Sequence, residues 1–143
     1  MRRVVSVLCL AACGTDRPPE EQDPLARVRA NAYQQWQRAP GYETRQASQG
    51  PHLGAVDIYI DENVAGALDA DQLDEWPLGS LIVKDGFDGS THRLVAIMEK
   101  RDDGWFWAEY LDDELKFSGK PDVCLNCHDA GGDFVLAFDL PGR

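Results

Sequence analysis

A series of short apolar segments, separated by turns rich in Asp and Gly, constrains the fold of this chain more than any other feature. We predict strands over Val56 to Ile60, Ser80 to Lys84, His92 to Lys100, Gly104 to Leu111 and Phe134 to Phe138. β-Branched and aromatic residues favour strands, and the first segment alternates apolar and polar side chains as a half-buried strand does. Residues 85–89 and 101–104 are typical of hairpin turns. We therefore expect an antiparallel sheet.

The residues before the first strand have the pattern of an amphipathic helix. Asp23 and Pro24 are typical of a helix cap and first helical position, and Pro40-Gly41 should end the helix. The apolar residues between them recur on one helical face: Leu25, Val28, Ala32 and Trp36. A second, short helix is expected over Glu62 to Ala70. The predicted fold class is α+β, with one antiparallel sheet and the N-terminal helix packed on one of its faces.

The first thirteen residues predict export. Two arginines precede a short apolar stretch, and the stretch ends in a sequence that resembles the lipobox of bacterial lipoproteins, Leu10-Ala11-Ala12-Cys13. We therefore predict a signal peptide over residues 1–12, a lipid anchor on Cys13, a polar tether over residues 13–23 and a folded domain over residues 24–143. The apolar stretch is far shorter than a membrane-spanning helix requires, so the lipid is the only membrane attachment expected.

The negative net charge of the chain excludes some classes of binding partner. The chain has 14 Lys and Arg against 25 Asp and Glu, a formal net charge of −11. Such a chain repels phosphate backbones and anionic lipid head groups, so nucleic acid is excluded as a partner. Gly14 follows the predicted lipidated cysteine, where an aspartate would resemble an inner-membrane retention signal. In a Gram-negative host this predicts a periplasmic protein anchored to the outer membrane.

The most specific motif is Cys124-Leu125-Asn126-Cys127-His128, which matches the C-x-x-C-H pattern of c-type haem attachment. Two thiols at this spacing reach the two vinyl groups of one haem, and the adjacent histidine donates a ring nitrogen to the iron. The pattern predicts one covalently bound haem c per chain, with Cys124 and Cys127 as attachment residues and His128 as iron ligand. Export agrees with this prediction, because bacteria attach haem covalently outside the cytoplasm.

Three alternatives to haem attachment involve the same two cysteines. A structural zinc site needs two more ligands, and outside the leader only His52 and His92 remain, without the usual spacing. A disulfide between the two cysteines is another alternative. A thioredoxin-like redox pair normally follows an early strand in a βαβ unit, whereas this motif lies near the C-terminus after antiparallel strands. Haem is the favoured interpretation.

The sixth coordination position of the iron decides what such a haem can do. The candidate protein ligands are Met98, His92 and His52, but Met98 alternates with apolar residues on a predicted core face, and His92 begins a strand. Electron-transfer cytochromes c are usually helical with an early haem motif. A late motif on a β-rich scaffold therefore favours an open iron site, with a simple electron carrier as an alternative.

Four segments in order resemble the cytochrome P-460 family, which includes the cytochromes c-prime beta, over roughly residues 24–140. They are residues 56–60, residues 76–85, residues 105–110, and the haem motif followed by Asp133-Phe134-Val135. The resemblance implies a β-rich fold with one c-type haem, a proximal histidine and an open distal side. Members of this family oxidise hydroxylamine or bind nitric oxide.

The resemblance also implies roles for particular residues. A lysine bonded to the porphyrin distinguishes the P-460 enzymes, and the matching segment makes Lys84 the candidate for this cross-link, if burial keeps its amine neutral. Oxidation of hydroxylamine needs a proton acceptor, for which Glu114 is the candidate. Phe87 and Phe117 are expected to line the haem pocket and favour a small ligand.

Two functions follow from these expectations. The first is an oxidoreductase acting on hydroxylamine or nitric oxide, which predicts a cross-linked Lys84, a proton acceptor and a periplasmic redox partner. The second is a protein that binds nitric oxide as a scavenger or sensor, which predicts an unlinked Lys84 and an apolar distal side. Either function allows a homodimer.

Overall fold

A computed structural model describes residues 23–142 of the chain. The predicted signal peptide, Cys13 and all but the last residue of the predicted tether lie outside the described residues. Within residues 23–142, no helix is both long enough and apolar enough to cross a membrane.

Among the described residues, seven strands form one antiparallel sheet in the order β1-β3-β4-β5-β6-β7, with β2 also paired to β3. The strands are β1 (Gln37–Arg38), β2 (Gln46–Ala47), β3 (Ala55–Ile60), β4 (Leu81–Asp88), β5 (Thr91–Arg101), β6 (Gly104–Leu111) and β7 (Glu114–Gly119). The helices are α1 (Pro24–Ala30), the single 3-10 turn η2 (Tyr33–Gln35), α2 (Glu62–Ala67) and α3 (Asp122–His128). The α+β class with an antiparallel sheet is confirmed.

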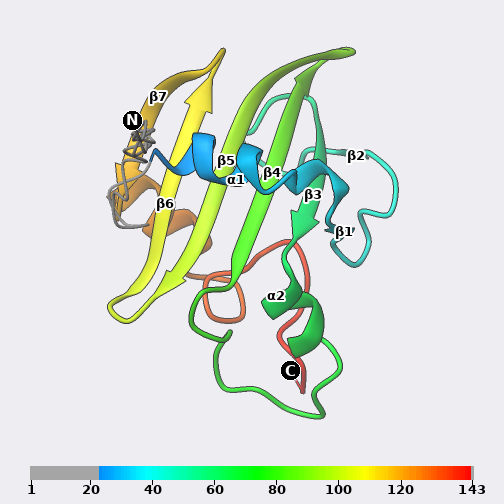
Figure 1. Cartoon of the computed structure of the whole chain (residues 1–143), viewed down its shortest axis with the longest axis vertical. Helices are drawn as coiled ribbons and strands as arrows, with labels where there is room; N and C mark the ends of the chain where they lie inside the picture. The colour runs from blue at the N-terminus through cyan, green and yellow to red at the C-terminus, as the bar shows by residue number, and fades with distance from the viewer. Residues whose placement is uncertain (1–22, 143) are drawn as a thin grey trace, which may run out of the picture.

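α1 lies across one face of the sheet (Figure 1). The Asp23 carboxylate caps the helix by accepting a hydrogen bond from Ala26 N, and Leu25 and Val28 are buried against the sheet. The helix is shorter than predicted, because the chain turns at Asn31 and Ala32 adopts a left-handed conformation with φ of 48°. The prediction of one helix up to Pro40 is therefore wrong, since a left-handed residue interrupts the helical hydrogen bonds.

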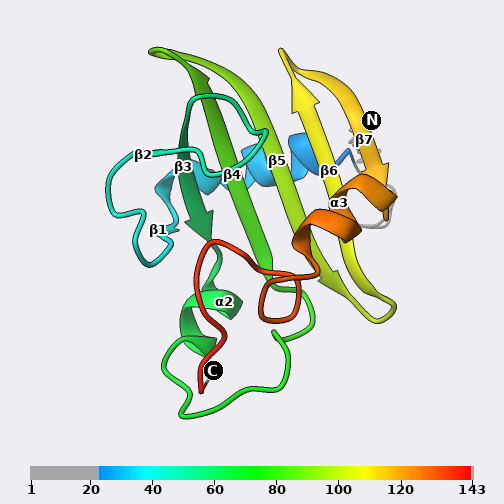
Figure 2. The ribbon, with the colours of Figure 1, turned by 180° about the vertical axis from the view of Figure 1, so that it is seen from behind.

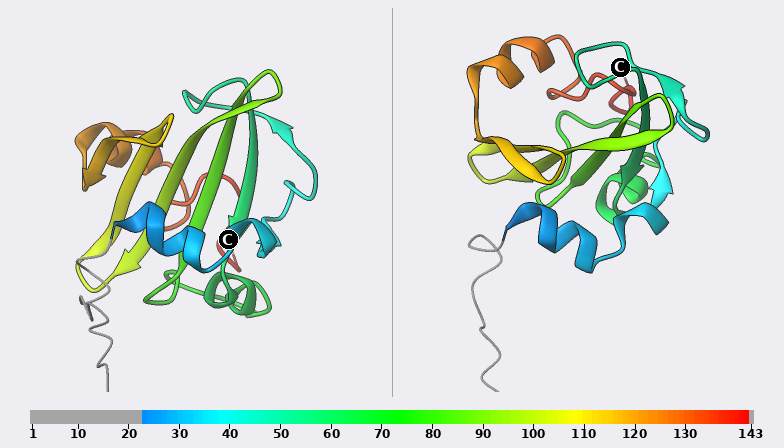
Figure 3. Two further views of the ribbon diagram at one scale, coloured as in Figure 1. Left: turned by 45° about the horizontal axis from the view of Figure 1, so that its top comes forward. Right: turned by 90° about the horizontal axis from the view of Figure 1, so that it is seen from above.

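The sheet has a hydrophobic core on each face. One core contains Leu25 and Val28 of α1, and the other lies on the face away from α1. Figure 2 shows α3 and the C-terminal segment on this side, and the right view of Figure 3 shows α1 and α3 on opposite sides of the sheet. The core residues of this side include Val56, Ile58, Ile60, Val64, Trp76, Ile82, Trp105, Trp107, Val135, Phe138 and Leu140. Since both faces are covered, β3 is buried on both sides rather than half-buried.

Residues 134–138 do not form the predicted final strand. Only an isolated bridge between Gly132 and Val135 occurs there. Asp133 and Phe134 have φ values of 47° and 64°, so the chain bends where a strand would have to begin. The segment is apolar because Val135 and Phe138 pack into the core, and burial of this kind does not require a strand.

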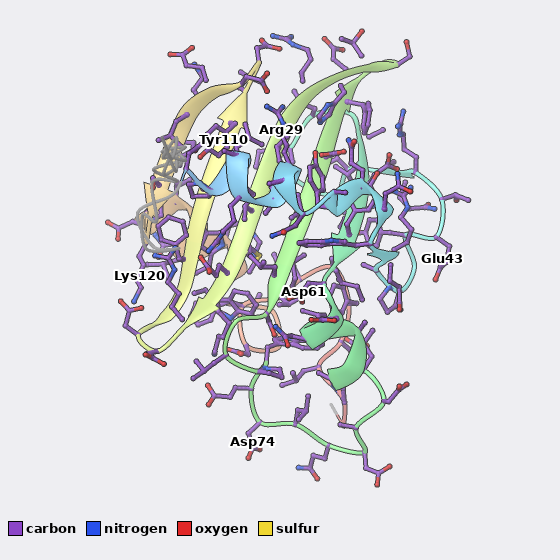
Figure 4. All side chains as sticks on the ribbon, viewed as in Figure 1. Arg29, Glu43, Asp61, Asp74, Tyr110 and Lys120 are labelled. Carbon is purple, nitrogen blue, oxygen red and sulfur yellow. The ribbon has the colours of Figure 1, made fainter. Side chains whose placement is uncertain are left out.

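The ends of β4 and α2 also differ from the prediction. β4 runs to Asp88, four residues beyond the predicted strand end at Lys84, so most of the predicted turn at residues 85–89 is strand. Asp61 caps α2 by accepting a hydrogen bond from Val64 N, and Figure 4 labels this residue where the helix starts. α2 ends at Ala67, three residues earlier than predicted. β7 was not predicted, because it is an edge strand whose side chains are almost all exposed and therefore show no apolar face.

Candidate functional site

The sheet face opposite α1 forms the floor of a cleft. Strand pairing aligns two rows of residues across β3, β4, β5 and β6: Ile58, Lys84, Ala96 and Glu109 in one row, and Ile60, Ile82, Met98 and Trp107 in the next. All of these except Ile60 line the cleft. Ala96 stands between Lys84 and Glu109, and its small side chain leaves room between them. The floor is thus apolar except for Lys84 and Glu109.

α3, which contains the C-x-x-C-H motif, forms a wall of the cleft. Positions three and four residues apart lie on the same face of a helix, so Cys124, Cys127 and His128 all line the cleft. Both cysteines are free thiols, Cys124 half-buried and Cys127 exposed. Burial raises the pKa of Cys124, and the nearby Glu109 carboxylate raises it further.

His128 is held in one orientation. Its Nδ1 lies 2.9 Å from Phe134 O and, as the donor of this hydrogen bond, leaves Nε2 free to bind a metal. Burial lowers the pKa of His128, which favours the neutral imidazole that ligates iron. The ring also makes an edge contact with Trp107, with centroids 6.2 Å apart.

Lys84 lies in the cleft, near the middle of β4 rather than at the end of its strand. Burial lowers its pKa, while the nearby Glu109 carboxylate acts in the opposite direction. A lowered pKa increases the fraction of neutral amine, the form that acts as a nucleophile.

The cleft also contains a histidine and carboxylate pair that the sequence did not identify. His52 Nδ1 lies 3.1 Å from Glu109 Oε2, and both side chains are largely buried. His52 belongs to the loop over residues 48–52, which passes close to β4. A Cβ added at Gly86 would lie 2.8 Å from His52 O, so glycine is needed for this approach. Alternation along β6 could have revealed Glu109, because it shares a face with Trp105 and Trp107.

Glu114 lies outside the cleft. It is at the start of β7, where its exposed carboxylate makes an ion pair with Lys116, 2.6 Å apart. The structure therefore does not bring Glu114 to the candidate site. The carboxylate that lies there is Glu109, in the adjacent strand.

The two phenylalanines expected in the pocket also lie elsewhere. Phe87 is on the α1 side of the sheet, where its ring contacts His92 and is covered by the Arg45 guanidinium 3.3 Å from its centroid. Phe117 is 41% exposed on β7. The aromatic residues that line the cleft are Tyr42 and Trp107.

Of the three residues predicted as possible sixth iron ligands, two lie in the cleft and one does not. Met98 and His52 line the cleft. His92 lies 3.2 Å from the buried Asp85 carboxylate and is not part of the cleft lining.

The donor set of the cleft fits a covalently attached haem. Two free thiols, an oriented neutral histidine and a largely apolar floor share one cleft. Trp107 Nε1 is buried and has no hydrogen-bond partner among the described residues, so it could donate to a polar group of a bound molecule. Within residues 23–142, no three or more His, Cys, Asp or Glu side chains gather in a group that could hold a metal ion. A haem iron takes four nitrogens from its own porphyrin, and His128 alone is sufficient as a protein ligand.

No family model matches the sequence, and no curated protein matches it.

Proposed function

We propose that this chain is an exported c-type cytochrome of the P-460 type, which holds one haem in the cleft and oxidises hydroxylamine or nitric oxide. The observation that supports the proposal best is that Cys124, Cys127, His128 and Lys84 line a single cleft. These residues come from α3 and from the centre of the sheet, 40 or more positions apart in the chain. A zinc site or a redox disulfide would give no reason for a half-buried lysine in the same cleft as the thiols.

The residues of α3 would hold the haem. Cys124 and Cys127 would form the two thioether bonds, and His128 Nε2 would be the axial ligand, with its ring fixed by Phe134 O. When bound, the haem iron supplies the centre that binds a small nitrogen compound and exchanges electrons with a periplasmic redox partner.

Lys84 distinguishes the enzyme from a protein that only binds gas. It is half-buried, and burial lowers its pKa, which favours a neutral amine. Lys84 lines the same cleft as Cys124 and Cys127. A neutral amine in the same cleft could form a bond to a porphyrin carbon. That bond would replace one N–H and one C–H bond and release two protons and two electrons, so it would need an oxidant such as a peroxide. We therefore retain Lys84 as the proposed cross-link residue.

Glu109 replaces Glu114 as the proposed proton acceptor. Its Oε2 can accept a proton from a substrate held in the cleft, and His52 Nδ1, 3.1 Å away, can share that proton. The pair is largely buried, which limits exchange of the proton with bulk water.

Nitric oxide binding without turnover is the second candidate. The apolar part of the lining favours it, since Ile58, Ile82, Ala96 and Met98 offer no polar group to a substrate.

The location of the protein also belongs to the proposal: lipidation of Cys13 would anchor it in the periplasm, at the outer membrane of a Gram-negative host.

Absorption spectra of the full chain, exported with c-type maturation machinery, test the proposal. We expect a red-shifted, broadened reduced Soret band in the wild type and an ordinary c-type band in Lys84→Met. An ordinary high-spin c-type band in both proteins would refute the cross-link and favour gas binding. A protein without any haem band would refute both functions.

The proton acceptor is tested with a matched pair of variants. Glu109→Gln should reduce hydroxylamine oxidation by about 10²-fold, the range typical of losing a general base. Glu114→Gln removes a carboxylate outside the cleft and should leave the rate unchanged. Equal rates for both variants would exclude Glu109 from proton transfer.

A further inference from the structure

The turn that follows α3 has an unusual backbone. Asp133 and Phe134 are consecutive non-glycine residues in the left-handed region, with φ values of 47° and 64°. Each such residue costs roughly 1–2 kcal/mol. The conformation therefore requires tertiary contacts that hold it, and these contacts come from a distant strand.

Lys100, the next to last residue of β5, makes these contacts. Its side chain is 6% exposed, and Nζ lies 2.9 Å and 2.8 Å from the two carboxylate oxygens of Asp133. Nζ also lies 3.1 Å from Glu75 Oε2. Burial alone would lower the pKa of Lys100, but the hydrogen bonds to Asp133 and Glu75 raise it overall, so the ammonium stays charged.

Asp133 receives a second bond from the same region. Trp76 is almost fully buried, and its backbone N donates to Asp133 Oδ2 over 2.8 Å. The carboxylate thus connects the turn to the end of β5 and to the segment before β4. We name the Lys100 and Asp133 pair, with its bond from Trp76, the turn anchor.

The turn anchor is adjacent to the carbonyl that orients His128. Phe134 directly follows Asp133, and Phe134 O accepts the hydrogen bond from His128 Nδ1. Trp107 packs against both rings, with centroids 6.2 Å from His128 and 6.1 Å from Phe134. A hydrogen bond to the outer nitrogen of a ligating histidine fixes its orientation and increases its basicity.

We propose that Lys100 is a positioning residue for His128, acting through Asp133 and the Phe134 carbonyl to set the strength of the axial bond. This inference rests on the proposed function, because it requires His128 to ligate a haem iron. A purely structural ion pair would affect the stability of the fold and leave the iron bond unchanged. The two roles therefore differ in a measurable property.

The test compares ferrous holoprotein of the full chain with its Lys100→Met variant. The variant keeps an apolar stem of similar length and loses the charge, so Asp133 loses its cation and Phe134 O is less well held. We expect the iron–histidine stretching frequency in resonance Raman spectra to decrease and the haem reduction potential to increase, since a less basic imidazole donates less charge to the iron. Lys100→Arg should restore both values toward the wild type.

Asp133→Asn and Lys120→Met complete the design. Asp133→Asn breaks the ion pair while keeping an oxygen for Trp76 N, and it should shift the frequency in the same direction as Lys100→Met. Lys120→Met removes a partly exposed lysine that contacts Asp103, and both values should be unchanged.

The outcomes separate this inference from the proposed function. A wild-type protein without a haem band would refute the proposed function, and the positioning role with it. A wild-type haem band together with an unchanged stretching frequency in Lys100→Met and Asp133→Asn would refute the positioning role alone. Failure of both variants to fold would show that the ion pair is structural and would also overturn the proposal.

Discussion

Replacement of Gly131 by alanine should destabilise the fold by forcing apart two backbone segments. Gly131 lies between α3 and the turn that carries Phe134 O. An added Cβ would lie 2.3 Å from Val135 O, 2.5 Å from Val135 C and 2.9 Å from Leu136 N. All three are backbone atoms, which cannot rotate away as a flexible side chain can. Relief therefore requires the backbone of residues 131–136 to shift.

The expected cost follows from this overlap. Overpacking in well-packed sites typically costs about 1–3 kcal/mol, and we expect Gly131→Ala to fall in the upper half of this range because the backbone must move. Urea unfolding followed by tryptophan fluorescence measures the change in free energy of unfolding. With an m-value of about 1–3 kcal/mol/M, the midpoint should fall by roughly 1 M.

A second glycine provides the control. Gly66 lies within α2, and an added Cβ there meets no atom within 4 Å. Gly66→Ala should stabilise the protein by up to about 1 kcal/mol, because alanine is the better helix former. If Gly131→Ala unfolds within about 0.5 kcal/mol of the wild type, the close approach of Gly131 to the backbone of Val135 and Leu136 is incorrect.

Three further predictions concern other parts of the molecule. Burial raises the pKa of Asp57, but hydrogen bonds from Arg45 and Arg38 lower it overall below the ordinary 3.8. Asp57 therefore stabilises the fold above pH 3.8, and this contribution is lost as the pH falls through its folded pKa. Asp57→Asn should cost about 2 kcal/mol at pH 7 and flatten the loss of stability in acid; an unchanged acid unfolding curve would contradict this. Ala96→Phe should fill the space between two polar residues of the cleft and reduce the haem content of purified protein, and full haem content would argue against the assigned cleft. Cys13→Ala should move the protein from membrane to soluble fractions, whereas unchanged partitioning would refute the lipid anchor.

Local patterns predicted the strands that are apolar or alternating. β6 has the predicted limits and β5 extends by one residue at each end, because their core residues carry a clear signal. β4 continues four residues beyond its predicted end at Lys84, because the Asp and Gly of residues 85–88 resemble a turn although they form part of the strand. β7 was missed because an exposed edge strand shows no burial pattern. Residues 134–138 were assigned wrongly because burial of an irregular segment produces the same apolar composition as a strand.

The candidate site could be predicted where its residues are contiguous. The haem motif is local, and its three functional residues lie together on α3. Glu109 and His52 could not be paired in advance, since their proximity depends on strand register and on a loop crossing β4. The prediction that Phe87 lines the pocket is wrong, since its side chain lies with Asp85 and His92 on the α1 side of the sheet.

Covalent haem attachment is the central claim, and the absorbance that stays with the polypeptide after denaturation tests it most directly. The full chain would be exported with c-type maturation machinery, denatured, and separated from unbound small molecules. We predict that haem absorbance remains with the wild-type chain and is absent from the double variant Cys124→Ala/Cys127→Ala. A wild-type chain that carries no haem after this treatment, in cells that mature another c-type cytochrome normally, would contradict the account.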